Sequence, residues 1–327
     1  MKKKVNQEFD RIFGPVPSRR LGLSLGVDLM PHKTCSLDCV YCECGRTTHL
    51  TIQPREYTPV DQIRRELDSF LSTRPQIDFL TFSGSGEPTL HSGIDEIIQY
   101  MKTDYPEYSV AILTNGTLFH LPAVRKRVLQ ADVIISSFDA ASEAMFKKIN
   151  RPHPSLSLDD MLDGITALKK EFANQLWMEV FIIPGHNDDQ EELGRIQQVM
   201  DRIQPDQIQI NSLDRPGTES WVKPVDQEVL KTIQACMHNV SMVDKPGASR
   251  SVNTFAGDLK GRIVSTIRRR PCTVADISEI TGANENKINQ HLDILLKNGE
   301  VVKKQMPRGT FFFLKQQAES MKPDLPV

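Results

Sequence analysis

The amino-acid sequence predicts an α/β fold, in which a partial barrel of six parallel strands is followed by a small winged-helix domain. Three observations support this prediction. Short apolar runs alternate with longer amphipathic ones through the middle of the chain, a pattern typical of βα units. A stretch rich in Gly, Ser and Pro at 244–258 indicates a linker. Three helical patterns and two short strands follow it, in a segment with more basic than acidic residues.

The predicted strands come in chain order, each followed by a segment long enough for a crossover. The strands are 21–27, 77–82, 108–114, 132–138, 177–183 and 206–213, and the helices between them include 60–71, 94–101, 158–172 and 190–203. Right-handed crossovers would place these helices on the outside of the sheet. Six units are fewer than the eight of a closed barrel, so we expect a lateral opening. Functional groups should lie at the C-terminal ends of the strands.

The domain boundaries follow from these patterns. A further helix is expected at 226–237, before the linker. Helices at 259–270, 273–282 and 284–299, with strands at 300–305 and 310–314, form the predicted winged helix. The predicted units are therefore an N-terminal segment (1–22), the partial barrel (23–215), a helical extension and linker (216–257), the winged-helix domain (258–316) and a tail (317–327).

The composition excludes several classes of protein. The chain has 327 residues, 39% of them hydrophobic, and a formal net charge of −2. No apolar run approaches the roughly 18 residues that a membrane span needs, and the basic N-terminus lacks the apolar stretch of a secretory signal. We therefore expect a cytoplasmic protein. Because thiols stay reduced in that compartment, clustered cysteines predict a metal site or catalysis rather than disulfides.

Four cysteines lie close together on the loop after the first predicted strand. Thiolates with the spacing of Cys35, Cys39 and Cys42 can surround one cubane iron–sulfur cluster and leave its fourth iron open. A structural zinc site would need four ligands, usually as two separated pairs, and no second pair is present at suitable spacing. Cys44 is expected to be a partly buried thiol beside the cluster, whereas the isolated Cys236 and Cys272 are expected to pack in the interior.

The cysteine pattern, with Tyr41 as the aromatic residue before the third cysteine, resembles that of the radical S-adenosylmethionine (SAM) superfamily. The resemblance extends over roughly residues 15–215. It implies one [4Fe–4S] cluster on Cys35, Cys39 and Cys42, whose open iron binds the amino and carboxylate groups of SAM. One electron then cleaves SAM to a 5′-deoxyadenosyl radical, which takes a hydrogen atom from the substrate. It also implies an electron donor such as flavodoxin or ferredoxin.

Further segments at predicted strand ends resemble the cofactor-binding motifs of the same superfamily. Because "SGSGEPTLH" follows the second strand, the resemblance assigns Gly84, Gly86, Glu87 and Pro88 to the methionine amino group. Glycine allows close backbone approach, and an ammonium needs an acceptor. Four residues at the ends of later strands are placed to contact the ribose, the carboxylate or the adenosine, and Tyr41 is also expected beside the cofactor. The four are Asn115, Ser137, Asp139 and Asn211.

Within the superfamily, the stretch at 14–45 and the "DRPG" after the last strand resemble the branch that includes the wyosine-synthesis enzyme of tRNA. The cyclase that starts molybdopterin synthesis is a more distant resemblance. No cysteine precedes Cys35, so a second N-terminal cluster is not expected, and neither reaction is assigned to this chain.

Three interpretations of the winged helix remain open. It binds nucleic acid, or it binds a peptide along its hairpin, or it docks against the barrel and covers the open side. Residues 258–315 contain eleven Lys or Arg against six Asp or Glu, which favours nucleic acid. The residues expected to contact it are Lys287, Asn289 and Gln290 on the third helix, and Lys303, Lys304 and Arg308 on the wing.

A few charged residues and histidines also allow two interpretations. Arg19, Arg20 and Arg151 either reach an anionic group of the substrate or form ion pairs. His32 and His91 are expected to be hydrogen-bonded loop residues.

The sequence thus supports three hypotheses about function. The first is a radical SAM enzyme that modifies a nucleic acid such as tRNA. The second is an enzyme of the same kind that acts on a peptide or a small metabolite. The third is a regulator that binds DNA and uses the cluster as a sensor.

Overall fold

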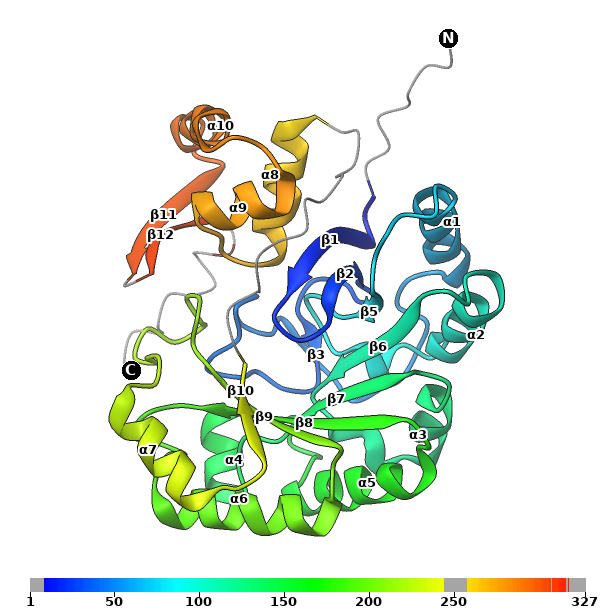
Figure 1. The fold of residues 1–327 in the computed structure, drawn as a ribbon, viewed down its shortest axis with the longest axis vertical. Coiled ribbons are helices and arrows are strands. Elements are labelled where there is room, and N and C mark those ends of the chain that lie inside the picture. Colours follow the sequence, from blue (N-terminus) through cyan, green and yellow to red (C-terminus); the bar gives the residue numbers. More distant parts are fainter. Residues whose placement is uncertain (1–8, 244–257, 307, 316, 318–327) are drawn as a thin grey trace.

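The computed structural model describes residues 9–243, 258–306, 308–315 and 317. The predicted linker at 244–257 and most of the predicted C-terminal tail lie outside the described residues. The described chain forms a large α/β unit and a smaller C-terminal unit beside it (Figure 1).

The large unit is built on one open sheet of eight strands. Their order is β1 (Ile12–Ser18), β2 (Gly22–Val27), β5 (Phe79–Phe82), β6 (Ser109–Thr114), β7 (Val133–Ser137), β8 (Gln175–Ile182), β9 (Gln207–Ser212) and β10 (Val240–Met242). All neighbours from β2 to β10 are parallel, and β1 is antiparallel to β2. The sheet curves as an incomplete barrel, so the predicted α/β fold is confirmed.

The six predicted strands are present as β2 and β5 to β9, and two strands that were not predicted, β1 and β10, extend the sheet at its two margins. β1 contains Gly14, Pro15 and Pro17, a composition more typical of turns, but prolines are accepted on an edge strand because only one side of it needs donors. β10 has three residues, too few to show a periodicity. The predicted N-terminal segment and the predicted extension each contribute one strand to the sheet.

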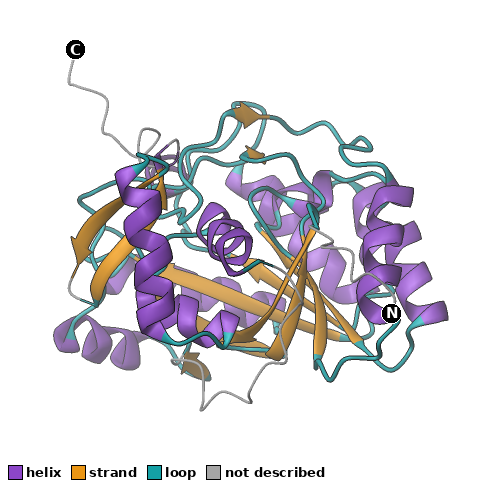
Figure 2. Cartoon of the chain, turned by 90° about the horizontal axis from the view of Figure 1, so that it is seen from above, coloured by secondary structure: helices purple, strands orange, loops and turns teal. Residues whose placement is uncertain are grey.

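Helices cover the outer face of the sheet (Figure 2). Two-residue strands β3 (Thr34–Cys35) and β4 (His49–Leu50) pair within the loop after β2, and single-turn helices η1 (Pro88–Leu90) and η2 (Thr117–His120) follow β5 and β6. The helices of this unit are α1 (Val60–Leu71), α2 (Ile94–Asp104), α3 (Pro122–Val128), α4 (Glu143–Ile149), α5 (Leu158–Glu171), α6 (Gln190–Ile203) and α7 (Gln227–Cys236).

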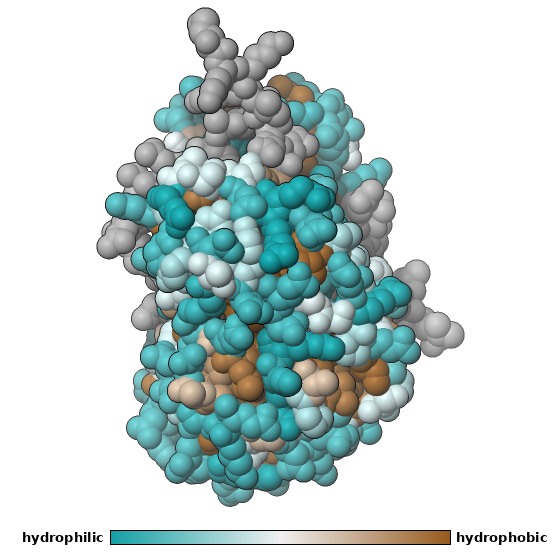
Figure 3. Space-filling view, turned by 90° about the vertical axis from the view of Figure 1, so that its right-hand side faces the viewer, coloured by the Kyte–Doolittle hydropathy of each residue, from teal (hydrophilic) through white to brown (hydrophobic). Residues whose placement is uncertain are grey.

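Both faces of the central strands are apolar, as expected for a parallel sheet that is covered on both sides. Leu80, Val110 and Ile134 point to the helices and are fully buried. Ala111 and Ile135 point into the barrel and pack in a separate cluster. On the side of α1 and α2, the surface is mostly hydrophilic with separate hydrophobic patches (Figure 3). No helix in the described part of the chain has both the length and the apolar character needed to cross a bilayer.

The smaller unit is the predicted winged helix. It consists of α8 (Leu259–Arg269), α9 (Val274–Thr281), α10 (Glu285–Lys297) and the antiparallel pair β11 (Val301–Met306) and β12 (Gly309–Leu314). Its own core includes Ile267, Ile277, Ile288, Leu292 and Leu295, so the predicted apolar face of the third helix is confirmed. The unit packs through α8 and α9 against β1, and α10 lies on its outer side (Figure 1).

Candidate functional site

The cysteine loop after β2 is held against the segment that follows β5. The Lys33 amide donates to Ser85 O, at 3.0 Å, and the Glu87 amide donates to Thr34 O, at 3.1 Å. A Cβ on Gly86 would lie 2.3 Å from Thr34 O, so only glycine lets the two backbones approach this closely. Gly86 therefore allows the loop that carries Cys35 to pack directly against the segment after β5.

Each of the three predicted cluster cysteines accepts a hydrogen bond at sulfur. The side-chain amide of Asn115 donates to Cys35 Sγ at 3.5 Å, and the side-chain amide of Asn150 donates to Cys39 Sγ at 3.6 Å. Lys33 Nζ donates to Cys42 Sγ at 3.0 Å. Donors to the sulfurs, and the burial of the site, are what proteins use to tune an iron–sulfur cluster. The donor set therefore fits thiolate ligands.

The thiols differ in their protonation. Burial raises the pKa of Cys35 to about 11 and raises that of Cys39 well above its usual value. Hydrogen bonds from Cys44 and the nearby Lys33 ammonium lower the pKa of Cys42 well below the ordinary thiol value, although burial opposes this. Binding of iron must therefore displace protons from Cys35 and Cys39.

In the described ranges, no three His, Cys, Asp or Glu side chains converge closely enough to hold a single metal ion. A cubane cluster does not require such convergence, because each cysteine binds a different iron atom. The three thiols, their N–H donors and the cation of Lys33 fit a [4Fe–4S] cluster.

A small cavity of about 190 Å³ lies beside the cysteines, inside the C-terminal end of the barrel. It brings together several of the predicted site residues from four different segments of the chain. Those that line it are Cys35, Cys39, Gly86, Glu87, Asn115 and Ser137, with Arg20 and Glu179 on its wall.

Glu87 is buried and accepts four hydrogen bonds from the protein. Its Oε1 accepts from the backbone amide of Thr89 (3.0 Å), the Thr89 hydroxyl (2.5 Å) and the Thr114 hydroxyl (2.6 Å). Its Oε2 accepts from the backbone amide of Asn115 (2.8 Å). Burial nevertheless raises the pKa of Glu87. Glu87 thus ties the end of β5 to the end of β6. Its contact with an ammonium group remains a prediction.

Tyr41 and Asp139 bind each other and do not line the small cavity. The Tyr41 hydroxyl donates to Asp139 Oδ2, and its ring stacks on Phe181 with centroids 3.9 Å apart. The same carboxylate accepts from the Asn150 amide at 2.7 Å and from the Phe181 amide at 2.9 Å. Burial raises the pKa of Asp139. The pair braces the cysteine loop, and the lining of the small cavity, in the described part of the chain, does not include Asp139.

Three other predicted residues also lie outside the cavity lining. Gly84 packs against the Asp28 side chain, and Pro88 begins η1. Asn211 is buried at the end of β9, and its Oδ1 accepts from the Ser212 amide at 2.9 Å.

The segment after β9 braces the cysteine loop from the other side. A Cβ on Gly217 would lie 2.8 Å from Tyr41 O, so the glycine of "DRPG" permits the contact. The Thr218 hydroxyl donates to Cys42 O at 3.2 Å, and the Glu219 amide donates to Val40 O at 2.9 Å. These contacts give the "DRPG" segment a structural role next to the cysteines.

The open interpretations of charged and histidine residues are partly settled by these contacts. Arg20 forms an ion pair with Glu179 inside the barrel, and burial lowers the pKa of Arg20 to about 10. Arg151 pairs with Glu219 at 2.7 Å. His91 is buried and bonded to Thr58 O at 2.8 Å, so its expected structural role is confirmed.

Arg308, which was predicted to contact nucleic acid, takes part in ion pairs with two aspartates, and its contact with nucleic acid remains a prediction. Its guanidinium pairs with Asp276 of α9 at 2.8 Å and with Asp214, which follows β9, at 3.2 Å. Lys287, Asn289 and Gln290 on α10 are exposed, as are Lys303 and Lys304 on β11. Contact of these five residues with nucleic acid remains a prediction.

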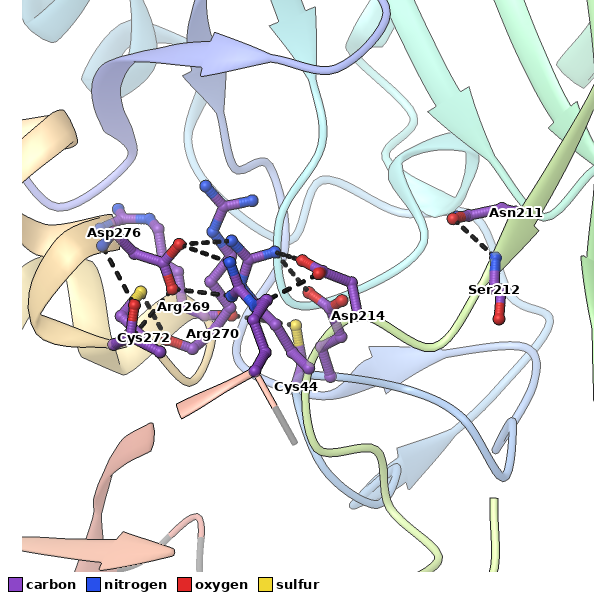
Figure 4. Close-up of polar contacts among 12 residues, drawn as sticks. Cys44, Asn211, Ser212, Asp214, Arg269, Arg270, Cys272 and Asp276 are labelled. Carbon is purple, nitrogen blue, oxygen red and sulfur yellow. Dashed lines mark hydrogen bonds and ion pairs between the residues drawn. The ribbon is translucent and has the colours of Figure 1, made fainter. Parts of the chain in front are cut away.

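Cys44 lies where the two units meet (Figure 4). Its thiol donates to Arg269 O of α8 at 3.1 Å. Nearby, Arg215 of "DRPG" pairs with Asp276 of α9 at 3.4 Å. Cys44 is thus a contact between the cysteine loop and the winged helix, and Asn211 and Ser212 lie apart from this network (Figure 4).

Three residues of the site were not found by sequence reasoning. Lys33 and Asn150 donate to cysteine sulfurs, but neither belongs to a periodic pattern that marks such a role. Glu179 had a usable signal, because it is the single charged residue in the apolar run "WMEVFII", where alternation places it on the inner face of the barrel.

Two family models match the chain. Residues 29–195 match the model described as the radical SAM superfamily. Residues 259–303 match the model of bacterial regulatory proteins of the arsR family, which supports the winged helix.

The chain is also similar to known proteins over most of its length. A Methanocaldococcus jannaschii protein named UPF0026 protein MJ1312 is 30% identical over 93% of this chain and 95% of its own length. A Brachyspira hyodysenteriae protein named GTPase Obg is 34% identical over 92% of this chain, which spans 44% of that longer protein. A solved structure of TYW1 with a lysine–pyruvate adduct shares the fold, with a TM-score of 0.50 and 16% identity, over 67% of this chain and 74% of that one.

Proposed function

The chain belongs to the radical SAM superfamily and is a radical SAM enzyme, and from this premise we propose that it modifies a nucleic acid substrate such as tRNA. Enzymes of this family use a [4Fe–4S] cluster and SAM. In the proposal, the cluster, when bound, supplies the electron that cleaves SAM to a 5′-deoxyadenosyl radical. The electron would come from a donor such as flavodoxin or ferredoxin, in the cytoplasm.

One observation carries the cofactor part of the proposal. The sulfurs of Cys35, Cys39 and Cys42 each accept an N–H hydrogen bond, and the first two cysteines border a cavity at the C-terminal end of a partial barrel. We infer that these three cysteines hold the cluster. Asn115, Ser137 and Gly86 would then orient SAM in the cavity, because they supply polar groups and close backbone approach there.

In the proposal, the chain's own apolar residues would keep water away from the radical site. The lining of the cavity includes Leu113 and Ile135, and the Arg20–Glu179 ion pair lies in the same lining. A buried ion pair contributes little to stability compared with apolar packing. We therefore propose that Arg20 and Glu179 orient a polar group of the substrate.

The substrate part of the proposal is supported by the winged helix. Its exposed outer helix carries Lys287, Asn289 and Gln290, and its hairpin carries Lys303 and Lys304. Amide side chains suit base edges, and lysines suit phosphates. The solved structure of TYW1 resembles this chain in fold.

The test is anaerobic reconstitution with iron and sulfide, reduction, and detection of 5′-deoxyadenosine after SAM is added. Wild type and the control Cys236→Ala should form it, and Cys39→Ala should not. Bulk tRNA should increase the yield for wild type and fail to do so for Lys303→Gln/Lys304→Gln. If a fully loaded wild-type cluster yields no 5′-deoxyadenosine with any reductant, the radical mechanism is rejected.

A second candidate is a regulator that binds DNA and senses the state of its cluster, which the match of residues 259–303 to arsR-type regulators favours. A regulator of this kind would retain its response to DNA when Glu87 is replaced, whereas an enzyme would lose turnover. A third candidate, modification of a peptide or small metabolite, would show turnover that tRNA does not stimulate.

A further inference from the structure

A second and larger cavity, of about 790 Å³, lies between the barrel and the winged helix. Its walls come from β1, from the loop before Cys35 and from α8. It shares no lining residue with the small cavity beside Cys35 and Cys39. Its volume lies within the roughly 300–1,000 Å³ of small-molecule sites, which often form where two domains meet. The geometry is that of a binding site separate from the radical site.

The lining of this cavity is cationic. It includes five arginines against three aspartates, and two of these aspartates already accept backbone hydrogen bonds. One of the five, Arg46, pairs with Glu219, and burial lowers the pKa of His32, so the positive charge comes from the other four arginines. Arg11, Arg262 and Arg269 donate to carbonyl oxygens, and within the described ranges none of them forms an ion pair with a carboxylate. Buried charges without a counter-ion are costly, so an anionic occupant would stabilise the site.

Burial disfavours the charged form of two of these arginines. It lowers the pKa of Arg262 and of Arg269 below the ordinary arginine value. Among the residues that the structure describes, the buried Nε atom of Arg269 has no hydrogen-bond acceptor. Arginine is the side chain best suited to phosphate, because its planar guanidinium offers several donors in a fixed fork.

Part of the remaining lining is apolar, and the rest of it includes small polar residues such as Ser265 and Thr266. Phe9, Ile12, Phe13 and Val264 contribute to the apolar part, and the Arg269 guanidinium lies 4.4 Å from the centre of the Phe13 ring. A flat, weakly polar ring system packs well on aromatic and aliphatic surfaces of this kind. The occupant should therefore combine an anion with a flat apolar part.

We propose that this interdomain cavity binds a nucleoside phosphate, with the phosphate against Arg262 and Arg268 and the base against Phe9, Ile12 and Val264. The occupant would touch Pro31 and His32, which precede Cys35, and α8 of the winged helix. It would therefore contact both units at once. The ligand is either a free nucleotide or one nucleotide of a bound strand, and the chemistry of recognition is the same for both.

Ser265 provides a matched pair of variants, because it lies on α8 and lines the cavity. Ser265→Glu places a carboxylate among the arginines, and Ser265→Gln adds the same volume without charge. Anaerobic isothermal titration of the full-length, cluster-loaded protein would use AMP, ATP, inorganic phosphate and a 5′-phosphorylated RNA tetranucleotide. Wild type and Ser265→Gln should bind a nucleotide probe at least ten-fold more tightly than Ser265→Glu does, and at least ten-fold more tightly than inorganic phosphate.

The probes also distinguish the two sources. Binding of AMP or ATP indicates a free nucleotide, whereas tight binding of the tetranucleotide with weak binding of both mononucleotides indicates a strand. Equal affinities of Ser265→Glu and Ser265→Gln, or no binding of any nucleotide to wild type, would overturn the proposal. Inorganic phosphate binding as tightly as AMP would overturn the role assigned to the apolar wall.

A second pair of variants covers the case in which Ser265→Glu does not fold. Arg268→Met removes an exposed cation from the cavity lining, and Arg202→Met removes one from an exposed pair with Asp163 on the barrel. Only Arg268→Met should weaken nucleotide binding. Formation of 5′-deoxyadenosine is measured on the same samples. Nucleotide binding without 5′-deoxyadenosine would reject the proposed function and leave this inference standing, and the reverse result would reject this inference alone.

Discussion

Lys33 places a cation 3.0 Å from the sulfur of Cys42. Its backbone is in the left-handed region, with φ at 54°, which is uncommon for a residue with a side chain and needs support from its surroundings. The amide hydrogen bond to Ser85 O gives that support. Although burial opposes the charge, the Cys42 thiolate raises the pKa of Lys33. The lysine is therefore held protonated beside a proposed cluster ligand.

Replacement of Lys33 by methionine should lower the reduction potential of the cluster. Reduction adds a negative charge to the site, and the ammonium stabilises that charge. A hydrogen bond to a charged group contributes about 1.5–3 kcal/mol, so 5′-deoxyadenosine formation should slow roughly ten- to hundred-fold. Lys33→Arg, which keeps the charge, is the control. An unchanged midpoint in a potentiometric titration of Lys33→Met would contradict this role.

Glu87 should be equally sensitive to a conservative change. Glu87→Gln keeps the shape but points an amide N–H₂ at groups that are themselves donors, and an unsatisfied buried group costs about 1–3 kcal/mol. Urea unfolding should show this loss. Glu96→Gln, in an exposed pair with Arg64, should change the stability by less than about 1 kcal/mol. Equal stabilities of the two variants would show that the four hydrogen bonds of Glu87 are dispensable.

At the scale of elements, the loop that carries the cysteines is clamped from two sides. Gly86 holds it against the end of β5, and Gly217 holds it against the segment after β9. These two segments are far apart in the sequence and come together only because the sheet curves. The clamp sets the position of Cys35 and Cys42 relative to the cavity before any ligand binds.

The central elements could be predicted because their patterns depend on local burial. The strands β2 and β5 to β9 have buried apolar positions, and α10 shows its buried face in the positions of Ile288, Leu292 and Leu295. The roles of Asp139 and Arg308 depend instead on contacts across the fold. The sequence places Asp139 at a strand end but does not show that Tyr41 and Asn150 occupy its carboxylate. Likewise, an arginine on a wing gives no sign that two aspartates pair with it.

Asp276 of α9 should control the docking of the winged helix. Burial by itself would raise the pKa of Asp276, but the positive charges of Arg215 and Arg308 outweigh this effect and lower it. A lowered pKa in the folded state gives a contribution to stability that is present above the usual aspartate pKa, near 3.8, and is lost as the pH falls through the lowered value. Asp276 also forms the capping box of α9 with Thr273. Asp276→Asn should therefore cost about 1–3 kcal/mol at pH 7.

Urea unfolding of Asp276→Asn and wild type at several pH values tests this prediction. The difference between them should be full at pH 7 and should shrink as the pH falls below about 3.8, where the carboxylate of the unfolded chain becomes protonated, and it should be lost as the pH falls through the lowered pKa of the folded state. Asp293→Asn on α10 is a suitable control, since Asp293 is exposed. A difference that stays constant with pH would assign the effect to packing rather than to charge.

On the scale of the whole molecule, the two units have separate hydrophobic cores. The contact between the units includes ion pairs. Leu292→Ala should remove apolar packing from the winged-helix core alone, at a cost of about 2–5 kcal/mol. We expect the winged helix to unfold first on heating, while the barrel keeps its cluster absorbance. Leu67→Ala in α1, which is fully buried in the barrel core, is the counterpart. A single transition shared by both units in Leu292→Ala would show that they unfold together.

The packing of α8 and α9 on β1 has a consequence for the open edges of the sheet. An open sheet has two margins, and unpaired strands there can recruit strands of other molecules. One margin is β10, which has three residues and offers little to pair with. The other is β1, which is longer, but its prolines lack amide hydrogens, and the winged helix lies against it. The winged helix thus covers the longer margin of the sheet, so a barrel truncated before α8 should self-associate even where it folds correctly.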